Sequence, residues 1–127
     1  MYPKDLKYDR EHEWVKVEGD VAILGISYFA QDQLGEVVYV DLPSVGDSVN
    51  VGESFGEIES VKSVSELFSP VTGEIVEVND ALGDSPETVN EDPYGEGWMV
   101  KIAMGDSSEL DGLMASDEYE AFIAEEA

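Results

Sequence analysis

The chain has 127 residues, a hydrophobic fraction of 43% and a formal net charge of -24 at pH 7. This length is typical of one domain and the apolar content can fill a core, so we expect a single domain over residues 1–127. With 30 acidic residues against 6 basic ones, nucleic acid and membrane surfaces are disfavoured as partners. The lack of cysteine excludes disulfides, thiol nucleophiles and cysteine-based metal sites.

The first ten residues are polar and mixed in charge, and no apolar run is long enough to span a membrane. We therefore expect a cytoplasmic protein, or a mitochondrial one if a presequence has been removed. The negative charge favours partners with cationic surfaces, whose attraction salt weakens. We expect the free chain to be a monomer.

Short runs of β-forming residues, separated by turn residues, dominate the first four fifths of the chain. The predicted strands are 14–17, 21–26, 37–42, 55–61, 66–68, 73–78 and 98–102. A long polar stretch, 80–97, is predicted as a connection that apolar side chains anchor against the core. Many short strands are typical of a sandwich or a barrel.

Two segments break the strand pattern. Residues 28–34 predict one short internal helix, with Ser27 as its N-cap and Gly35 as its end. After Gly105, apolar side chains recur at helical spacing, so residues 106–127 are predicted as a C-terminal helical segment.

Residues 35–41 and 73–79 have similar sequences, and a Gly-Asp-Ser follows each. Two similar strand units favour a pseudo-two-fold arrangement in which each half covers the apolar face of the other. Chance similarity of two valine-rich strands is the alternative. Between the copies, residues 57–67 are strand-like on both sides of a small polar centre, which predicts a hairpin tip.

The sequence lacks the residues that most kinds of catalytic site require. His12 is the only histidine, and the sequence has neither a nucleophile elbow nor a phosphate-binding glycine loop. The acidic segment 84–96 lacks the ligand spacing of an EF-hand loop. We therefore expect no catalytic residues of these classes and no metal site.

Lys62 is the only basic residue between Val17 and Val100, and it falls at the centre of the predicted hairpin tip. Its neighbours are mostly small, so an acylating enzyme could reach the amine and an attached arm could swing freely. An ordinary surface lysine is the alternative.

The run Glu59-Ser60-Val61-Lys62, followed by Ser-Pro-Val-Thr-Gly-Glu-Ile-Val-Glu-Val-Asn at 69–79, resembles the lipoyl-lysine region of glycine cleavage system H proteins. Stretches at 12–15, 30–38 and 89–98 agree in the same order, so the resemblance covers nearly the whole chain. Biotinyl domains usually place their lysine between two methionines. Lipoyl domains of 2-oxo acid dehydrogenases are shorter and lack the His-Glu-Trp segment.

The resemblance implies a mostly β fold, a flattened barrel-sandwich hybrid of two antiparallel sheets with Lys62 on a hairpin and with C-terminal helices. It also implies a carrier rather than an enzyme, with lipoate attached covalently to Lys62 by a lipoate ligase or lipoyl transferase. In that family the arm accepts an aminomethyl group from pyridoxal-phosphate glycine decarboxylase and delivers it to a tetrahydrofolate-dependent aminomethyltransferase. A dihydrolipoamide dehydrogenase then reoxidises the arm.

Glu13 and Glu66 match family positions that hold the amine of the loaded arm in a surface cleft. The alternative for both is an ordinary solvated carboxylate. His12 is interpreted as a hydrogen-bonded structural residue, and Trp14, Tyr94 and Trp98 as core or loop-anchoring aromatics. Two other functions remain open: a lipoate donor that relays lipoate to other acceptor domains, and an acidic binding module that carries no cofactor.

Overall fold

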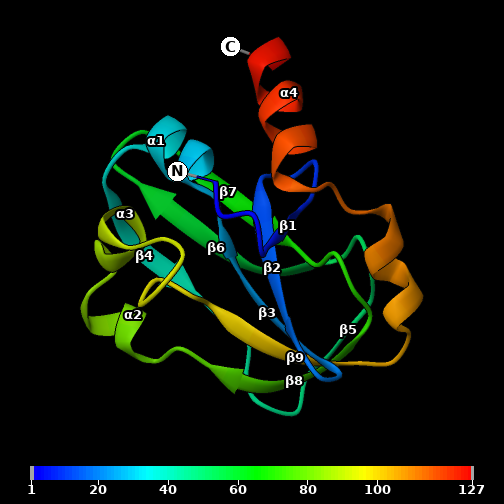
Figure 1. Ribbon diagram of the computed structural model, residues 1–127. Helices are drawn as coiled ribbons and strands as arrows, with labels where there is room; N and C mark the ends of the chain where they lie inside the picture. Colours follow the sequence, from blue (N-terminus) through cyan, green and yellow to red (C-terminus); the bar gives the residue numbers. More distant parts are fainter. Residues whose placement is uncertain (1, 127) are drawn as a thin grey trace.

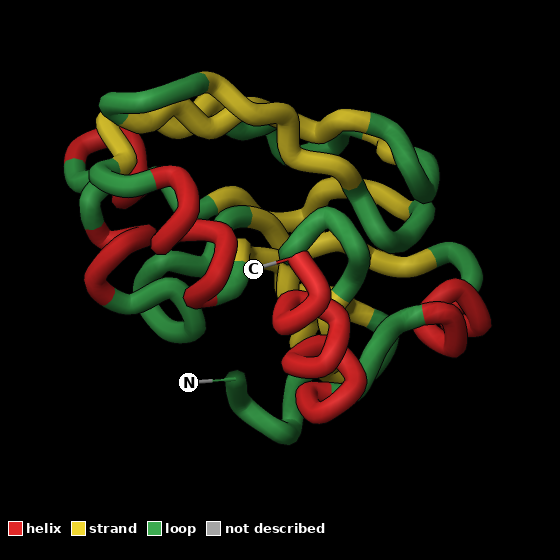
Figure 2. The backbone as a smooth tube through the Cα atoms, turned by 90° about the horizontal axis from the view of Figure 1, so that it is seen from above, coloured by secondary structure: helices red, strands yellow, loops and turns green. Residues whose placement is uncertain are grey.

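The computed structural model describes residues 2–126, which form two antiparallel β-sheets stacked as two layers (Figures 1 and 2). The larger sheet has six strands in the order β1-β2-β3-β9-β8-β5, and the smaller has three in the order β4-β6-β7. The strands are β1 (Lys7–Tyr8), β2 (Glu13–Glu18), β3 (Val21–Ile26), β4 (Val37–Asp41), β5 (Ser48–Val49), β6 (Ser54–Ser60), β7 (Val64–Phe68), β8 (Gly73–Val78) and β9 (Val100–Met104). The helices are α1 (Tyr28–Leu34), α2 (Ala81–Asp84), α3 (Thr88–Glu91), the 3-10 helix η1 (Ser107–Gly112) and α4 (Ser116–Glu126).

The two similar strand units lie in different sheets. Strand β4 belongs to the three-stranded sheet and pairs with β6, whereas β8 belongs to the six-stranded sheet and pairs with β5 and β9. Each sheet therefore contributes one copy of the unit to the space between the layers. This arrangement agrees with the predicted flattened barrel-sandwich fold.

Apolar side chains from both layers fill the space between the sheets. The fully buried members of this core include Leu24, Ile58, Ile75, Val100 and Ile102. Removing such side chains from water is the main favourable contribution to folding, and the alternation of buried and exposed positions along β6 fits its place in the layer.

A second apolar cluster attaches the C-terminal helix to the outside of the larger sheet. Tyr119 of α4 stacks on Tyr8 of β1, with ring centroids 4.7 Å apart, and both side chains are fully buried. Trp14 of β2 lies in the same cluster. The helix seen at the top of Figure 1 is thus fixed by aromatic packing rather than by the inter-sheet core.

Helix α1 forms where the sequence predicted it. The Ser27 hydroxyl accepts a hydrogen bond from Ala30 N at 3.2 Å, and Gly35 N donates to Gln31 O at 3.0 Å to close the last turn. These are the N-cap and C-terminal contacts that a serine and a glycine at these positions supply.

The structure differs from the sequence prediction in the segment 80–97. This segment contains α2 and α3, two four-residue helices that place Leu82 and Val89 in the core. The helices are too short to show a periodic pattern, which explains why the sequence indicated only a connection. The two-residue strands β1 and β5 escaped prediction for the same reason. In the described residues, no helix is long and apolar enough to cross a membrane.

Candidate functional site

Lys62 lies at the tip of the β6–β7 hairpin, as the sequence predicted. The last pair between the two strands is Glu59 with Val64, and residues 61–63 connect the end of β6 to the start of β7. The Ser60 hydroxyl accepts hydrogen bonds from Lys62 N at 3.1 Å and Ser63 N at 3.2 Å, and Ser60 N donates to Ser63 O at 2.8 Å. A short hydroxyl side chain at the start of the turn therefore holds the backbone that presents Lys62.

The Lys62 side chain is exposed and lies against Gly35, just after the end of α1. A Cβ atom at Gly35 would come within 3.3 Å of Lys62 Cε, and Gly35 has a positive φ of 79° that favours glycine. Three ion pairs occur among the described residues, His12–Glu126, Lys16–Glu18 and Lys101–Glu77, and none of them engages Lys62. Within residues 2–126 the amine is thus unpaired at an exposed tip.

Asn90 of α3 holds the backbone against which Lys62 lies. Its Nδ2 donates to Gly35 O at 2.7 Å and to Gln31 Oε1 at 3.1 Å, while its Oδ1 accepts from Val37 N at 2.9 Å. One side chain therefore joins α1, the Gly35 turn and β4. The tip is tied to the same region, because Val61 N donates to Glu36 O at 3.0 Å.

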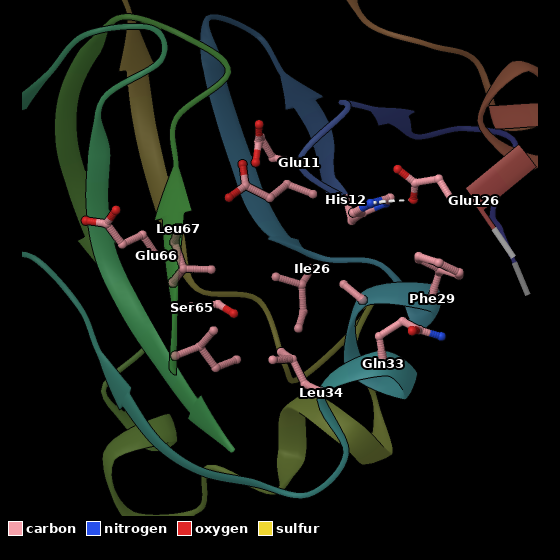
Figure 3. Close-up of a pocket in the computed structure, with 13 residues that line it drawn as sticks. Glu11, His12, Ile26, Phe29, Gln33, Leu34, Ser65, Glu66, Leu67 and Glu126 are labelled. Atoms are coloured by element: carbon pink, nitrogen blue, oxygen red, sulfur yellow. Dashed lines mark ion pairs between the residues drawn. The ribbon is translucent and has the colours of Figure 1, made fainter. Parts of the chain in front are cut away.

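A cleft of about 510 Å³ lies between α1, the start of β2 and strand β7 (Figure 3). Its lining residues are Glu11, His12, Glu13, Ile26, Phe29, Ala30, Gln33, Leu34, Ile58, Ser65, Glu66, Leu67 and Glu126. Leu34 lines the cleft and immediately precedes Gly35, on which the Lys62 side chain rests. The base of an arm on Lys62 would therefore start beside this cleft, whose walls combine apolar side chains with carboxyl groups.

Glu13 is one of the two carboxylates that the sequence singled out, and it is buried in the cleft wall at 2% exposure. Its Oε2 accepts a hydrogen bond from Phe68 N at 3.0 Å, while its Oε1 is buried and has no hydrogen-bond partner among the described residues. Burial raises the pKa of the Glu13 carboxyl well above its usual range, and the nearby Asp9 carboxyl raises it further. A buried acceptor without a partner is a place where a donor or cation can bind.

Glu66, the other carboxylate, lines the same cleft but is exposed. Because side chains alternate along a strand, Ser65 and Glu66 face opposite sides of β7. Figure 3 shows the Ser65 hydroxyl directed toward the interior of the cleft and the Glu66 carboxylate directed to the other side of the strand. The structure thus places both glutamates at one cleft in very different surroundings.

His12 links the cleft to the C-terminal helix. Its Nδ1 lies 2.9 Å from the hydroxyl of Tyr119, and its Nε2 lies 3.0 Å from Oε2 of Glu126. The Tyr119 hydroxyl also lies 2.6 Å from the Ser27 hydroxyl. These contacts agree with the interpretation of His12 as a hydrogen-bonded structural residue.

The three aromatic residues also have structural contacts. Trp14 Nε1 donates to Pro93 O at 2.8 Å, and the Tyr94 hydroxyl accepts from Tyr28 N at 2.8 Å. Trp98 packs on the same cluster, with its ring 5.1 Å from Lys101 Nζ. They hold the 92–98 segment against β2 and α1, as expected for anchoring residues.

Sequence reasoning missed Asp9, Glu11, Gln33 and Ser65 as residues at or near the cleft. Among 30 acidic residues, no spacing distinguishes the four that line it, Glu11, Glu13, Glu66 and Glu126. An available signal was Asp9 at the start of the turn that leads into β2, because aspartate side chains commonly accept hydrogen bonds from the next backbone amides of a turn.

The chain was compared with known proteins. A family model described as "Glycine cleavage H-protein" matches residues 6–126. A "Glycine cleavage system H protein" from Carboxydothermus hydrogenoformans is 53% identical over 126 residues, which covers 99% of this chain and 97% of the relative. One from Anaeromyxobacter sp. strain K is 56% identical over 124 residues and covers 98% of this chain and 97% of the relative.

The fold also resembles that of a solved structure. The crystal structure of a glycine cleavage system H protein from Mycobacterium marinum superposes with a TM-score of 0.89 at 40% sequence identity. The match covers 96% of this chain and 98% of that chain.

Proposed function

Because the chain belongs to the glycine cleavage H-protein family, we propose that it is a lipoyl carrier of the glycine cleavage system and that Lys62 is its attachment site. The observation that carries the proposal is the placement of Lys62. Its amine is unpaired within the described residues, stands on an exposed hairpin tip and lies beside a cleft that contains a buried carboxyl.

Attachment would convert the Lys62 amine to an amide with the carboxyl group of lipoate. The formal net charge would change from -24 to -25, since one ammonium is lost. The fold does not bury this ammonium, so attachment should leave the fold unchanged. When bound, lipoate supplies a dithiolane that can take up a carbon group and be reduced, chemistry that a chain without cysteine cannot supply itself.

The residues of the cleft fit an arm whose stem is apolar and whose cargo is cationic. Ile26, Leu34 and Leu67 offer apolar contact, and the partnerless Oε1 of buried Glu13 offers an acceptor for an ammonium group. A carboxylate in a partly dehydrated cleft stabilises a nearby cation more than one in water does. We assign Glu13 the contact to the aminomethyl amine of the loaded arm, with Glu66 as a second candidate at the rim.

The chain then acts as a carrier, and the chemistry takes place on its partners. Glycine decarboxylase, aminomethyltransferase, dihydrolipoamide dehydrogenase and a lipoate ligase or lipoyl transferase would each dock near Lys62. The charge of -24 favours cationic surfaces on these enzymes, and encounter should slow as salt rises. A cytoplasmic location and a monomeric free state stay predictions.

The proposal is tested with Lys62→Arg, which keeps the positive charge but removes the acylatable amine. Lys16→Arg is the matched control, because Lys16 is also an exposed lysine but lies on strand β2, away from the hairpin tip. Each protein is expressed with a lipoate ligase, weighed by intact-mass spectrometry and assayed for glycine decarboxylation with the partner enzymes. Wild type and Lys16→Arg should gain one lipoyl group and support turnover, whereas Lys62→Arg should do neither.

A lipoyl group on another lysine of Lys62→Arg, with activity retained, would show that Lys62 is not the site. The relay function would be favoured if lipoylated wild type supported no glycine decarboxylation but passed lipoate to other acceptor domains. A wild type that gains no lipoyl mass would favour an unmodified binding module.

A further inference from the structure

Asp9 fixes the turn that leads into β2. Its Oδ1 accepts hydrogen bonds from Glu11 N at 3.0 Å and Glu13 N at 2.9 Å. Asp9 N in turn donates to Glu13 O at 3.0 Å. The backbone that carries Glu13 is therefore held at both its amide and its carbonyl by one residue, and the Asp9 carboxyl is kept next to Glu13.

The two carboxyl groups also meet through their side chains. Glu13 N donates to Asp9 Oδ1 at 2.9 Å, which keeps the Asp9 carboxyl beside the Glu13 carboxyl, and Glu13 Oε1 is buried without a hydrogen-bond partner among the described residues. Two ionised carboxylates cannot bond to each other, because both are acceptors only. One proton between them allows a carboxyl–carboxylate hydrogen bond, which would give the buried Glu13 carboxyl a further partner.

Arg10 is the one basic residue that lines a pocket with Asp9, beside Glu11 and Glu109, and it forms no ion pair with Asp9 among the described residues. Of the groups at the cleft, Glu11 and His12 come from the same turn, Glu66 from β7 and Glu126 from α4. The α1 residues of the wall, Phe29, Ala30, Gln33 and Leu34, have no charge. His12 is engaged by Tyr119 and Glu126, and the Arg10 guanidinium lies over the Phe122 ring, 5.3 Å from its centroid. No ion pair among the described residues includes Asp9 or Glu13.

We propose that Asp9 and Glu13 share a single proton, and that Asp9 is a positioning residue which keeps Glu13 neutral until a primary ammonium group enters the cleft and takes the place of that proton. The identity of the cation rests on the proposed function, whereas the shared proton does not. On binding, Glu13 ionises and pairs with the ammonium group, and the proton passes to solvent. No covalent bond of the cargo changes in this step.

Burial is the main cause of the raised pKa of both carboxyl groups, and their proximity adds to it at Glu13. The backbone hydrogen bonds that Asp9 accepts from Glu13 and Glu11 oppose the rise at Asp9. The proton is therefore expected to reside mainly on Glu13, with the Asp9 carboxylate as its acceptor.

The test is a carbon-13 NMR titration of the side-chain carboxyl groups in the full chain without lipoate, with Glu13 and Asp9 assigned from the Glu13→Gln and Asp9→Asn spectra. In wild type, the pKa of Glu13 should lie above the usual glutamate value of about 4.3. Asp9→Asn keeps an oxygen for the two amide hydrogen bonds but removes the charge, so Glu13 should then titrate at lower pH. Glu11→Gln is the matched control, since it removes one charge from the same turn at a residue whose side chain forms no hydrogen bond to Glu13 among the described residues, and it should lower the pKa of Glu13 less.

The cation is tested at neutral pH with methylammonium as the probe. It should move the Glu13 signal toward its ionised position and release protons to the buffer, whereas tetramethylammonium, which has no N–H donor, should do neither. An ordinary glutamate pKa for Glu13 in wild type, or equal shifts of this pKa in Asp9→Asn and Glu11→Gln, would refute the shared proton. The Glu13 signal can be assigned from Glu13→Gln alone, so the wild-type titration remains decisive even if Asp9→Asn does not fold. None of these measurements requires lipoate, so failure of Lys62 as the attachment site would leave them interpretable.

Discussion

Glu13 connects the two sheets through Phe68: Oε2 of the glutamate at the start of β2 accepts a hydrogen bond from the backbone N–H at the end of β7, at 3.0 Å. The other carboxyl oxygen has no partner among the described residues. The Glu13 side chain thus links the edge strand of the three-stranded sheet to the six-stranded sheet. Its second oxygen remains available as an acceptor at the cleft. Under the proposed function, this carboxyl group serves both the structure and the contact to the loaded arm.

Glu13→Gln should stabilise the protein above the pKa of the folded-state carboxyl. The amide oxygen can still accept from Phe68 N, and the amide nitrogen can donate to Asp9. Because burial raises the folded-state pKa of Glu13, the folded protein holds this proton more tightly than the unfolded chain. The stability this group contributes is present at low pH and is lost as pH rises through the raised pKa.

We therefore expect wild type and Glu13→Gln to be about equally stable at acidic pH. At higher pH the free energy of unfolding of the variant should exceed that of wild type by about 1–3 kcal/mol, which is the usual cost of an unsatisfied buried polar group. Urea unfolding across a pH series measures this difference. The control is Glu96→Gln, at an exposed loop residue, where no such crossover is expected. A variant that is less stable at every pH would contradict the prediction.

Loss of the aminomethyl group from the loaded protein should depend more on Glu13 than on Glu66. Glu13 is buried with a partnerless oxygen, whereas the exposed Glu66 carboxylate is directed away from the interior of the cleft. A charge-assisted hydrogen bond contributes about 1.5–3 kcal/mol, so Glu13→Gln should hasten the loss by about tenfold or more. Glu66→Gln should change it much less. Formaldehyde release from each loaded protein measures the rate, and identical rates in all three would show that neither carboxylate holds the amine.

Asn90→Ala should destabilise the protein and disturb the base of the Lys62 arm. The change removes hydrogen bonds to Gly35 O and Val37 N, at a cost of about 1–3 kcal/mol for buried groups left unpaired. Because Lys62 lies against Gly35, lipoylation should also slow. Unfolding midpoints and the kcat/KM of a lipoate ligase are the readouts. Asn50→Ala, whose side chain bonds only to exposed Glu53, should change both values little.

Three carboxylates stand side by side across the outer face of the three-stranded sheet. Asp41 is opposite Glu57, which is opposite Glu66, and all three are exposed. Like charges directly opposite each other are destabilising by about 0.2–1 kcal/mol. Glu57→Gln should therefore stabilise the protein in dilute buffer.

The increase in stability caused by Glu57→Gln should be smaller at about 1 M salt, where the Debye length falls to about 3 Å. The wild-type unfolding midpoint should itself rise with salt, because screening relieves the repulsion among 30 acidic residues. Glu96→Gln serves again as the control for the loss of one charge far from this row. Salt-independent midpoints in both proteins would exclude self-repulsion as a limit on stability.

The features that the sequence determined are those set by neighbouring residues. Ser27 and Gly35 delimit α1, the polar centre between two strand-like runs places Lys62 on a hairpin tip, and the order of motifs identifies the family. Each follows from local backbone preference or from a contiguous pattern. Such information needs no knowledge of which strands meet.

Only the tertiary structure decided how the carboxyl groups of Glu13 and Glu66 are placed at the cleft. Glu13 and Glu66 have the same side chain, yet one is buried beneath β7 and the other is exposed on it, because their surroundings come from segments 55 residues apart in the sequence. The helices α2 and α3 are likewise held by core contacts of Leu82 and Val89 rather than by a periodic pattern. Burial, and with it the raised pKa of Glu13, depends on long-range pairing of the two sheets, which no local pattern encodes.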